Sequence, residues 1–186
     1  MSDSFHEGRA LACSLLGLQG LYLGGGYPEV HAAALTANTT MRQELKAFIE
    51  QGHVVYAECG GFMYLTEGLR TLSGQLFALV GVYPTVARML PHLKALGYVE
   101  VESAQAAGLF PRGYVRGHEF HYSELERADF YTEGLRPLYW VRHQRSEVAR
   151  PEGYLYKRCL ASYIHLHFGS NSELATMLVS AAGMLP

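Results

Sequence analysis

Two short apolar runs that end in glycines are the clearest pattern along the chain. Residues 20–23 precede Gly24-Gly25-Gly26, and residues 54–57 precede Glu58-Cys59-Gly60-Gly61. Residues 29–51 place apolar side chains at helical spacing up to Gly52, with a division at Asn38-Thr39-Thr40 and Thr39 or Thr40 as the N-cap of the second helix. Strands joined by a helical crossover are usually parallel, and continuous apolar runs are typical of strands buried on both faces.

The second half of the chain alternates apolar and polar residues, which is typical of strands. The expected strands are residues 95–102 and 113–120, antiparallel around a turn near Gly108, and then residues 139–142, 154–156 and 159–168. Residues 171–184 predict a terminal helix with Asn171 or Ser172 as N-cap and Glu173 in its first turn. The sequence therefore predicts one α/β domain over residues 1–186, with a mixed, mainly parallel sheet and flanking helices.

Composition narrows the classes of partner. The 186 residues are 49% hydrophobic and 17% charged, which argues against disorder. The net charge of −2 predicts no binding to nucleic acid or to an anionic membrane, and the longest apolar stretches are too short to span a bilayer. Three cysteines without a CxxC spacing and the absence of a recognisable signal peptide predict a cytoplasmic location.

Cys59 is the candidate nucleophile, because its segment reads as strand, tight turn and helix. Such a turn needs small residues two positions away, and these are Ala57 and Gly61. We expect a helix N-terminus to lower the thiol pKa and the Gly60 N–H to face a developing oxyanion, as covalent acyl transfer requires. The alternatives are a buried structural cysteine, which is also the interpretation of Cys13 and Cys159, and a redox sensor.

The candidate base lies in the segment Ser-Tyr-Ile-His-Leu-His-Phe, residues 162–168. Strand alternation would put His165 and His167 on one face at the end of an apolar strand. A nucleophilic thiol needs such a base. Metal binding by the two histidines and a packed structural histidine are the alternatives.

Four motifs in order resemble the glutamine amidotransferase domain of cobyrinic acid or hydrogenobyrinic acid a,c-diamide synthases. They are Tyr-Leu-Gly-Gly-Gly-Tyr-Pro-Glu at 22–29, Ala-Glu-Cys-Gly-Gly at 57–61, Gly-His-Glu-Phe-His-Tyr-Ser at 117–123, and the segment at 162–168. The resemblance covers residues 18–182 and implies a class I, triad-type, flavodoxin-like fold that takes ammonia from glutamine. It implies Cys59 as nucleophile, His165 as general base, and an oxyanion hole formed by Gly60 with Gly25 or Gly26.

Some positions depart from the wider superfamily or stay open. The superfamily has His-x-Glu in the last motif, where this chain has His167, so base activation must rely on geometry, another acid or a partner domain. Glu58 is expected to orient the turn or to contact glutamine. His118, Glu119 and His121 are expected to contact a synthase domain or the corrinoid acid, with a structural hydrogen-bond network as the alternative.

The resemblance also implies a second activity. In the family an ATP-dependent synthase domain, which would use ATP and Mg²⁺, activates the macrocycle carboxylates, but no phosphate-binding GxxxxGK[ST] loop occurs in this chain. We therefore expect no cofactor here, and we expect the partner to be a separate synthase domain or subunit. We expect residues 1–19 to be a divergent or truncated start of the family's domain, in which 9–18 predict a short helix.

Two interpretations remain. One is a glutaminase component, and the other is a non-catalytic fragment or binding module that forms a homo-oligomer to complete its sheet edge. Cobyrinic acid, hydrogenobyrinic acid and nickel-sirohydrochlorin are all candidate acceptors.

Overall fold

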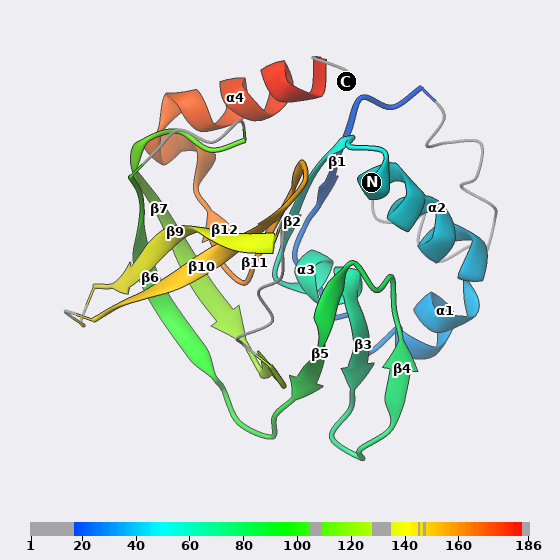
Figure 1. Ribbon diagram of the computed structural model, residues 1–186. Coiled ribbons are helices and arrows are strands. Elements are labelled where there is room, and N and C mark those ends of the chain that lie inside the picture. Colours follow the sequence, from blue (N-terminus) through cyan, green and yellow to red (C-terminus); the bar gives the residue numbers. More distant parts are fainter. Residues whose placement is uncertain (1–16, 105–108, 128–134, 145, 147, 184–186) are drawn as a thin grey trace.

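Two β-sheets and four α-helices form the structure, a computed structural model that describes residues 17–104, 109–127, 135–144, 146 and 148–183 (Figure 1). The larger sheet has the spatial order β1 (Gly20–Leu23), β2 (Val54–Glu58), β11 (Cys159–Ser162), β10 (Ala149–Tyr156), β9 (Leu135–His143), β6 (Ala95–Ser103), β7 (Gly113–His121) and β12 (His165–Leu166). The smaller sheet has the order β4 (Leu76–Ala78), β3 (Thr66–Arg70), β5 (Tyr83–Met89) and β8 (Ser123–Leu125). The helices are α1 (Ala32–Ala37), α2 (Thr39–Glu50), α3 (Gly60–Leu65) and α4 (Ser172–Gly183), with a 3₁₀ turn η3 at Phe168–Ser170.

The mixed sheet is confirmed, but the expectation that it is mainly parallel is wrong. Within the described residues of the larger sheet, β2 pairs in parallel with β1 and with β11, and the other five neighbouring pairs are antiparallel. The physical reason is the short connections: β6 with β7 and β9 with β10 are hairpins, and a short turn can only join antiparallel strands. The predicted antiparallel pairing of residues 95–102 with 113–120 is confirmed.

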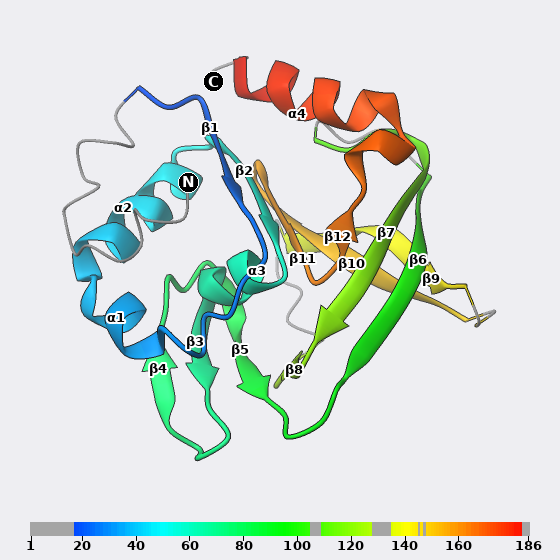
Figure 2. The same ribbon diagram turned by 180° about the vertical axis from the view of Figure 1, so that it is seen from behind.

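Strand β2 is buried on both faces, as its continuous apolar run predicts, whereas the same prediction is wrong for β1, an edge strand that is only partly buried. In β2, Val55 and Ala57 join a core cluster that includes residues of α2 and α3, whereas Val54 and Tyr56 join a second cluster that includes residues of α4. Accordingly, α2 and α4 lie on opposite sides of β1 and β2 (Figures 1 and 2). This burial holds the carboxyl end of β2, where Cys59 follows, in a fixed place.

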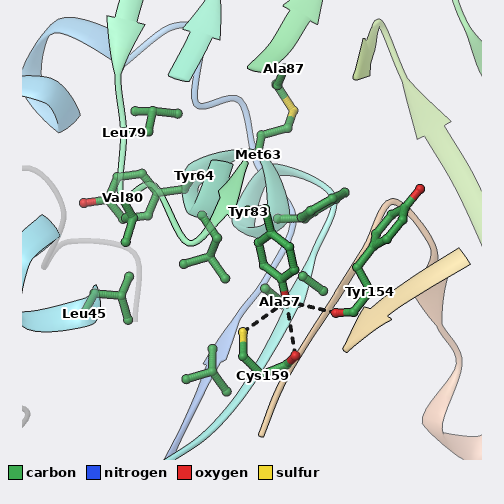
Figure 3. Close-up of a cluster of buried hydrophobic side chains, with 14 of the residues drawn as sticks. Leu45, Ala57, Met63, Tyr64, Leu79, Val80, Tyr83, Ala87, Tyr154 and Cys159 are labelled. Atoms are coloured by element: carbon green, nitrogen blue, oxygen red, sulfur yellow. Dashed lines mark hydrogen bonds between the residues drawn. The ribbon is translucent and has the colours of Figure 1, made fainter. Parts of the chain in front are cut away.

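A buried tyrosine ties the smaller sheet to this core. Tyr83 of β5 is fully buried, and its hydroxyl donates to the carbonyl oxygens of Tyr154 at 2.9 Å and Cys159 at 3.1 Å (Figure 3). The smaller sheet was missed by the sequence analysis, because β3 follows α3 directly without a turn signal and β4 and β8 have only three residues each.

The helix ends differ in part from the prediction. The N-cap of α2 is Asn38 rather than Thr39 or Thr40, since the Asn38 side chain accepts a hydrogen bond from the Met41 N–H at 3.1 Å. For α4 the expected Asn171 cap is confirmed: its side-chain oxygen accepts from the Glu173 N–H at 3.0 Å. Gly52, at φ +85°, follows α2 as predicted.

The single strand expected over residues 159–168 is wrong, because the chain leaves the sheet after Ser162. The Ser162 hydroxyl and the Tyr163 N–H both donate to the buried Glu152 carboxylate, and the Ile164 N–H donates to the Ser162 hydroxyl. Strand pairing resumes in β12, now against β7. The close approach needs a glycine at position 117, since a Cβ on Gly117 would lie 2.6 Å from the His165 carbonyl oxygen. The break brings His165 to β7.

Two remaining expectations concern other parts of the chain. Cys13 and most of the short helix expected over residues 9–18 lie outside the described residues. Among the residues that the structure describes, no helix has the length and apolar character needed to cross a membrane.

Candidate active site

Cys59 occupies the strained turn that the sequence predicts. It lies between β2 and α3 with φ +47° and ψ −103°, a conformation that costs a non-glycine residue about 1 to 3 kcal/mol. The turn is closed by tight glycine packing. A Cβ on Gly61 would overlap the Leu23 carbonyl, and a Cβ on Gly60 would lie 2.7 Å from the Gly26 oxygen.

The thiol of Cys59 is buried and protonated at neutral pH. Its residue is 6% exposed, and Sγ lies 3.8 Å from the Phe120 carbonyl oxygen of β7. Burial raises the pKa of the Cys59 thiol to about 11, although the hydrogen bond from the Gly60 N–H acts to lower it. The expectation of a lowered thiol pKa is therefore wrong, because burial outweighs the helix N-terminus. The thiol needs a base.

His165 lies on β12, where its ring is held from two sides. It stacks on the His118 ring of β7 with centroids 4.7 Å apart, and Gly25 approaches so closely that a Cβ there would overlap the imidazole. Burial lowers the pKa of His165 below its ordinary value of 6.5; the Glu58 charge opposes this shift, and the rings of His118 and His121 add to it. The ring is thus neutral at neutral pH and able to accept a proton.

The chain connections bring the candidate nucleophile and the candidate base into one region. The Cys59 N–H donates to the Ser162 carbonyl at 2.7 Å, three residues before His165. The glycine run after β1 completes the arrangement, since Gly25 lies against the imidazole of His165 and Gly26 lies against Gly60 of the turn. Cys59, His165 and the three glycines predicted for the oxyanion hole therefore gather at the carboxyl ends of β1 and β2.

Glu58 is an acidic residue whose carboxylate lies close to the candidate base. Its carboxylate accepts hydrogen bonds from the hydroxyls of Tyr22 at 2.6 Å and Tyr56 at 2.5 Å and from the Leu166 N–H at 2.8 Å. Its Oε2 lies 3.9 Å from Nδ1 of His165. The contact with His165 was missed by sequence reasoning, because the two residues are far apart in the chain. The available sequence signal was a tyrosine in each of the two apolar runs, Tyr22 and Tyr56, which are partners in the register of β1 and β2.

Comparison with known proteins fits this arrangement. A family model for the CobB/CobQ-like glutamine amidotransferase domain matches residues 8–173. The chain belongs to this family. It is 41% identical over 158 residues to the cobyrinate a,c-diamide synthase of Caldanaerobacter subterraneus subsp. tengcongensis, a match that covers 84% of this chain and 34% of the relative. It is 43% identical over 163 residues to that of Syntrophotalea carbinolica, covering 87% of this chain and 35% of the relative. The chain thus spans about a third of the length of the curated relatives it matches.

Solved structures bear out the fold. A crystal structure of a glutamine amidotransferase aligns with a TM-score of 0.63 at 19% identity, covering 91% of this chain and 82% of that one. The glutaminase domain of CTPS from Trypanosoma brucei aligns with a TM-score of 0.54 at 14% identity, covering 94% of this chain and 76% of that one. The class I amidotransferase-like α/β fold expected from the sequence is confirmed.

In this amidotransferase domain His167 is exposed, whereas His165 is partly buried. The His167 N–H donates to the Arg116 carbonyl at 2.8 Å, and the residue lines a pocket of about 410 Å³ together with Tyr98, Arg116 and His118. The pocket does not include Cys59 or His165 among its lining residues. A supporting role for His167 stays a prediction, and Glu58 lies beside the imidazole instead.

His118, Glu119 and His121 of the Gly-His-Glu-Phe-His motif lie in two different environments. Glu119 and His121 are buried, at 1% and 8% exposure, and Nε2 of His121 lies 3.7 Å from Oε1 of Glu119. Their burial favours the structural network over contact with a substrate or partner domain. His118 alone has an exposed position, so its contact with a substrate or partner stays a prediction.

The network around Glu119 is built on Arg150. This guanidinium pairs with Glu119 and with Glu152, and Nε2 of His143 lies 2.7 Å from Oε2 of Glu119. Burial alone would raise the pKa of Glu119, but the contact with His121 and the charge of Arg150 outweigh it and lower the pKa to about 2. The cluster is therefore a buried ion-pair and hydrogen-bond network that joins β7, β9 and β10.

Cys159 and the metal alternative are the remaining predicted features. Cys159 is fully buried, burial raises its pKa to about 12, and the Tyr83 hydroxyl contacts its Sγ at 3.4 Å, which agrees with a structural cysteine (Figure 3). Across the described ranges, no group of three or more His, Cys, Asp or Glu residues is arranged to hold a metal ion.

Proposed function

We propose that this chain is the glutaminase component of an a,c-diamide synthase, which hydrolyses glutamine and supplies ammonia for amidation of cobyrinic or hydrogenobyrinic acid. The observation that carries the proposal is Cys59 in its strained turn, joined through Gly25, Gly26 and Gly60 to the imidazole of His165. Acyl transfer needs a nucleophile, a neutral base and backbone N–H donors at one place, and this site offers all three.

The first half of the reaction forms a thioester. His165 accepts the proton of the Cys59 thiol, and Sγ attacks the side-chain carbonyl carbon of glutamine. The carbonyl oxygen becomes an oxyanion that receives hydrogen bonds from the Gly60 N–H and from the Gly25 or Gly26 backbone. His165 then gives its proton to the leaving amine, and ammonia departs.

The second half releases glutamate. His165 takes a proton from water, the resulting hydroxide attacks the thioester carbon, and the C–S bond breaks. The proton returns to the thiolate, so that glutamine and water give glutamate and ammonia with the enzyme unchanged. Because the pKa of Cys59 is about 11 and that of His165 is lowered, proton transfer from thiol to imidazole is uphill in the free protein. Bound glutamine must therefore supply part of the driving force.

The partner in this proposal is an ATP-dependent synthase domain or subunit. It would bind ATP and Mg²⁺, phosphorylate the a- and c-carboxylates of the corrinoid acid and let ammonia displace phosphate. Support comes from the relatives named cobyrinate a,c-diamide synthase, of whose length this chain spans about a third. The reaction would take place in the cytoplasm.

The test is glutamate release from glutamine, measured for the chain alone and with a synthase domain taken from one of the relatives. We expect release that Cys59→Ala and His165→Ala abolish, and ammonia-dependent amidation by the reconstituted synthase that survives Cys59→Ala. A folded chain that releases no glutamate under either condition would contradict the proposal and favour a non-catalytic binding module.

A further inference from the structure

The carboxylate of Glu58 is buried at the carboxyl end of β2, immediately before the nucleophile. The residue is 3% exposed, and among the described residues no Arg or Lys pairs with it. A buried charge without a cation is costly unless hydrogen bonds satisfy it. Three donors do so here, from the two tyrosine hydroxyls and the Leu166 N–H.

The two tyrosines fix the direction of this carboxylate. Tyr22 and Tyr56 are partners in the parallel register of β1 and β2, their rings stack at 5.6 Å, and Phe168 packs edge-on against both. Tyr22 donates to Oε2 and Tyr56 to Oε1. The carboxylate therefore cannot turn without losing charge-assisted hydrogen bonds, which are about twice as strong as neutral ones.

The same carboxylate reaches the strand that carries the base. Oε1 accepts the N–H of Leu166, the residue after His165, and Oε2 lies 3.9 Å from Nδ1 of the imidazole. With Nδ1 turned to a carboxylate, Nε2 is the nitrogen left to exchange protons with the thiol and the leaving group.

We propose that Glu58 is the positioning residue for His165, holding β12 through the Leu166 N–H and stabilising the imidazolium formed when His165 takes the thiol proton. The proposal rests on the glutaminase function proposed above. It assigns to the residue before the nucleophile the orienting role that the wider superfamily gives to the residue two positions after the histidine. In this chain that later position is the exposed His167.

The other groups around His165 cannot replace this carboxylate. His118 and His121, both from β7, act against an imidazolium, and the Cys59 thiol becomes an anion only as it gives up its proton. Glu58 is thus the carboxylate that opposes them among the described groups.

The experiment uses Glu58→Gln, which keeps the size and the acceptor oxygen but removes the charge. Glutamate release is measured with kcat and KM separated, and His165 is titrated by NMR on histidine-labelled full chain, with His165→Ala to assign its signal. We expect kcat to fall about 100-fold with KM within about threefold. We also expect the His165 midpoint and the acid limb of kcat/KM to move down by about one pH unit.

Two further variants separate charge from structure. Tyr22→Phe removes one donor but keeps the carboxylate, so the His165 midpoint should stay close to that of the wild type. Glu126→Gln is the matched control, because Glu126 pairs with Arg70 beside the smaller sheet and should affect neither readout.

Each outcome decides one of the two proposals. A folded Glu58→Gln chain with unchanged kcat and an unchanged His165 midpoint would overturn the role of Glu58. If Glu58→Gln fails to fold, Glu58→Asp takes its place, because its shorter side chain moves the carboxylate away from Nδ1 of His165. We then expect a lower kcat, and a Glu58→Asp chain with the turnover of the wild type would overturn the role of Glu58. A wild-type chain that releases no glutamate would overturn the glutaminase function, while the midpoint would still decide whether Glu58 acts on His165.

Discussion

Two buried carboxylate clusters lie on either side of β11, and they are satisfied in different ways. Glu58, on β2, accepts hydrogen bonds from tyrosine hydroxyls and a backbone N–H and faces His165. Glu119 and Glu152, on β7 and β10, share the guanidinium of Arg150. The first carboxylate has no cationic partner among the described Arg and Lys residues, whereas the second pair already shares one guanidinium.

The difference separates function from structure in the same core. A carboxylate held by neutral donors can stabilise a transient imidazolium, because no permanent cation competes for it. A carboxylate held by arginine instead ties strands together, and its loss exposes a buried unpaired group. We therefore expect changes in the Glu58 cluster to act mainly on catalysis, and changes in the Glu119 cluster to act mainly on stability.

The largest expected effect is on stability, from Glu119→Ala. It removes one partner of Arg150 and of His143 at a site 1% exposed, and breaking such a buried pair costs about 3 kcal/mol. Urea unfolding measures this free energy. Glu124→Ala, which removes exposed ion pairs to Arg88 and Lys94, is the control and should cost less than about 1 kcal/mol. Equal losses in the two variants would contradict the distinction between the clusters.

The next effect is on catalysis, from Gly25→Ala. The added methyl group would overlap the His165 ring and displace it, and a misplacement of about 1 Å can cost about 100-fold in rate. Glutamate release measures the loss, and thermal unfolding should change little. In Gly24→Ala the new Cβ meets only the Tyr22 ring at 3.8 Å, so near-normal release is expected there. A Gly25→Ala chain with full activity would show that the ring position is not critical.

A smaller effect is the response of stability to acid. The pKa of Glu119 is lowered to about 2 from an ordinary 4.5, so its stabilising contribution is fully present above pH 4.5 and is lost as the pH falls towards 2. We expect the wild type to lose about 2 kcal/mol more than Glu119→Gln across this range, a figure reduced because the Arg150 side chain is 41% exposed. Urea unfolding at a series of pH values tests this, and parallel curves would argue against the charge pairing.

The smallest effect concerns one hydroxyl in the Glu58 cluster. Tyr22→Phe removes one of three donors to the carboxylate, which should cost about 1 kcal/mol and lower kcat by less than about tenfold. A steady-state assay with a stability measurement on the same sample checks both. A loss as large as that of Glu58→Gln would mean that the tyrosine, rather than the carboxylate charge, governs the base.

The sequence predicted the parts of the fold that depend on local patterns. The turn at Cys59 needs small neighbours that can be read directly, and the hairpin of β6 and β7 follows from alternation. The Asn38 cap was missed by one position, because Asn and Thr are both good caps and only the hydrogen bond to Met41 distinguishes them.

Contacts between distant segments could not be predicted in the same way. The break after Ser162 depends on Glu152 of another strand, and the thiol pKa depends on how deeply the turn is buried. The proximity of Glu58 to His165 could not be predicted either, since it requires the break after Ser162, which moves the histidine away from β11 to the edge strand β12 on β7.

The measurement that tests the glutaminase site most directly is covalent labelling with a chloroketone analogue of glutamine, followed by peptide mass mapping. Both described cysteines are buried thiols with raised pKa values, but only Cys59 lies in the turn whose Gly60 packs against Gly26 of the glycine run, which also contacts His165 through Gly25. We expect one adduct per chain at Cys59, none at Cys159, and protection by glutamine. Labelling that glutamine does not reduce, or a folded chain that stays unlabelled at Cys59, would contradict a glutaminase site.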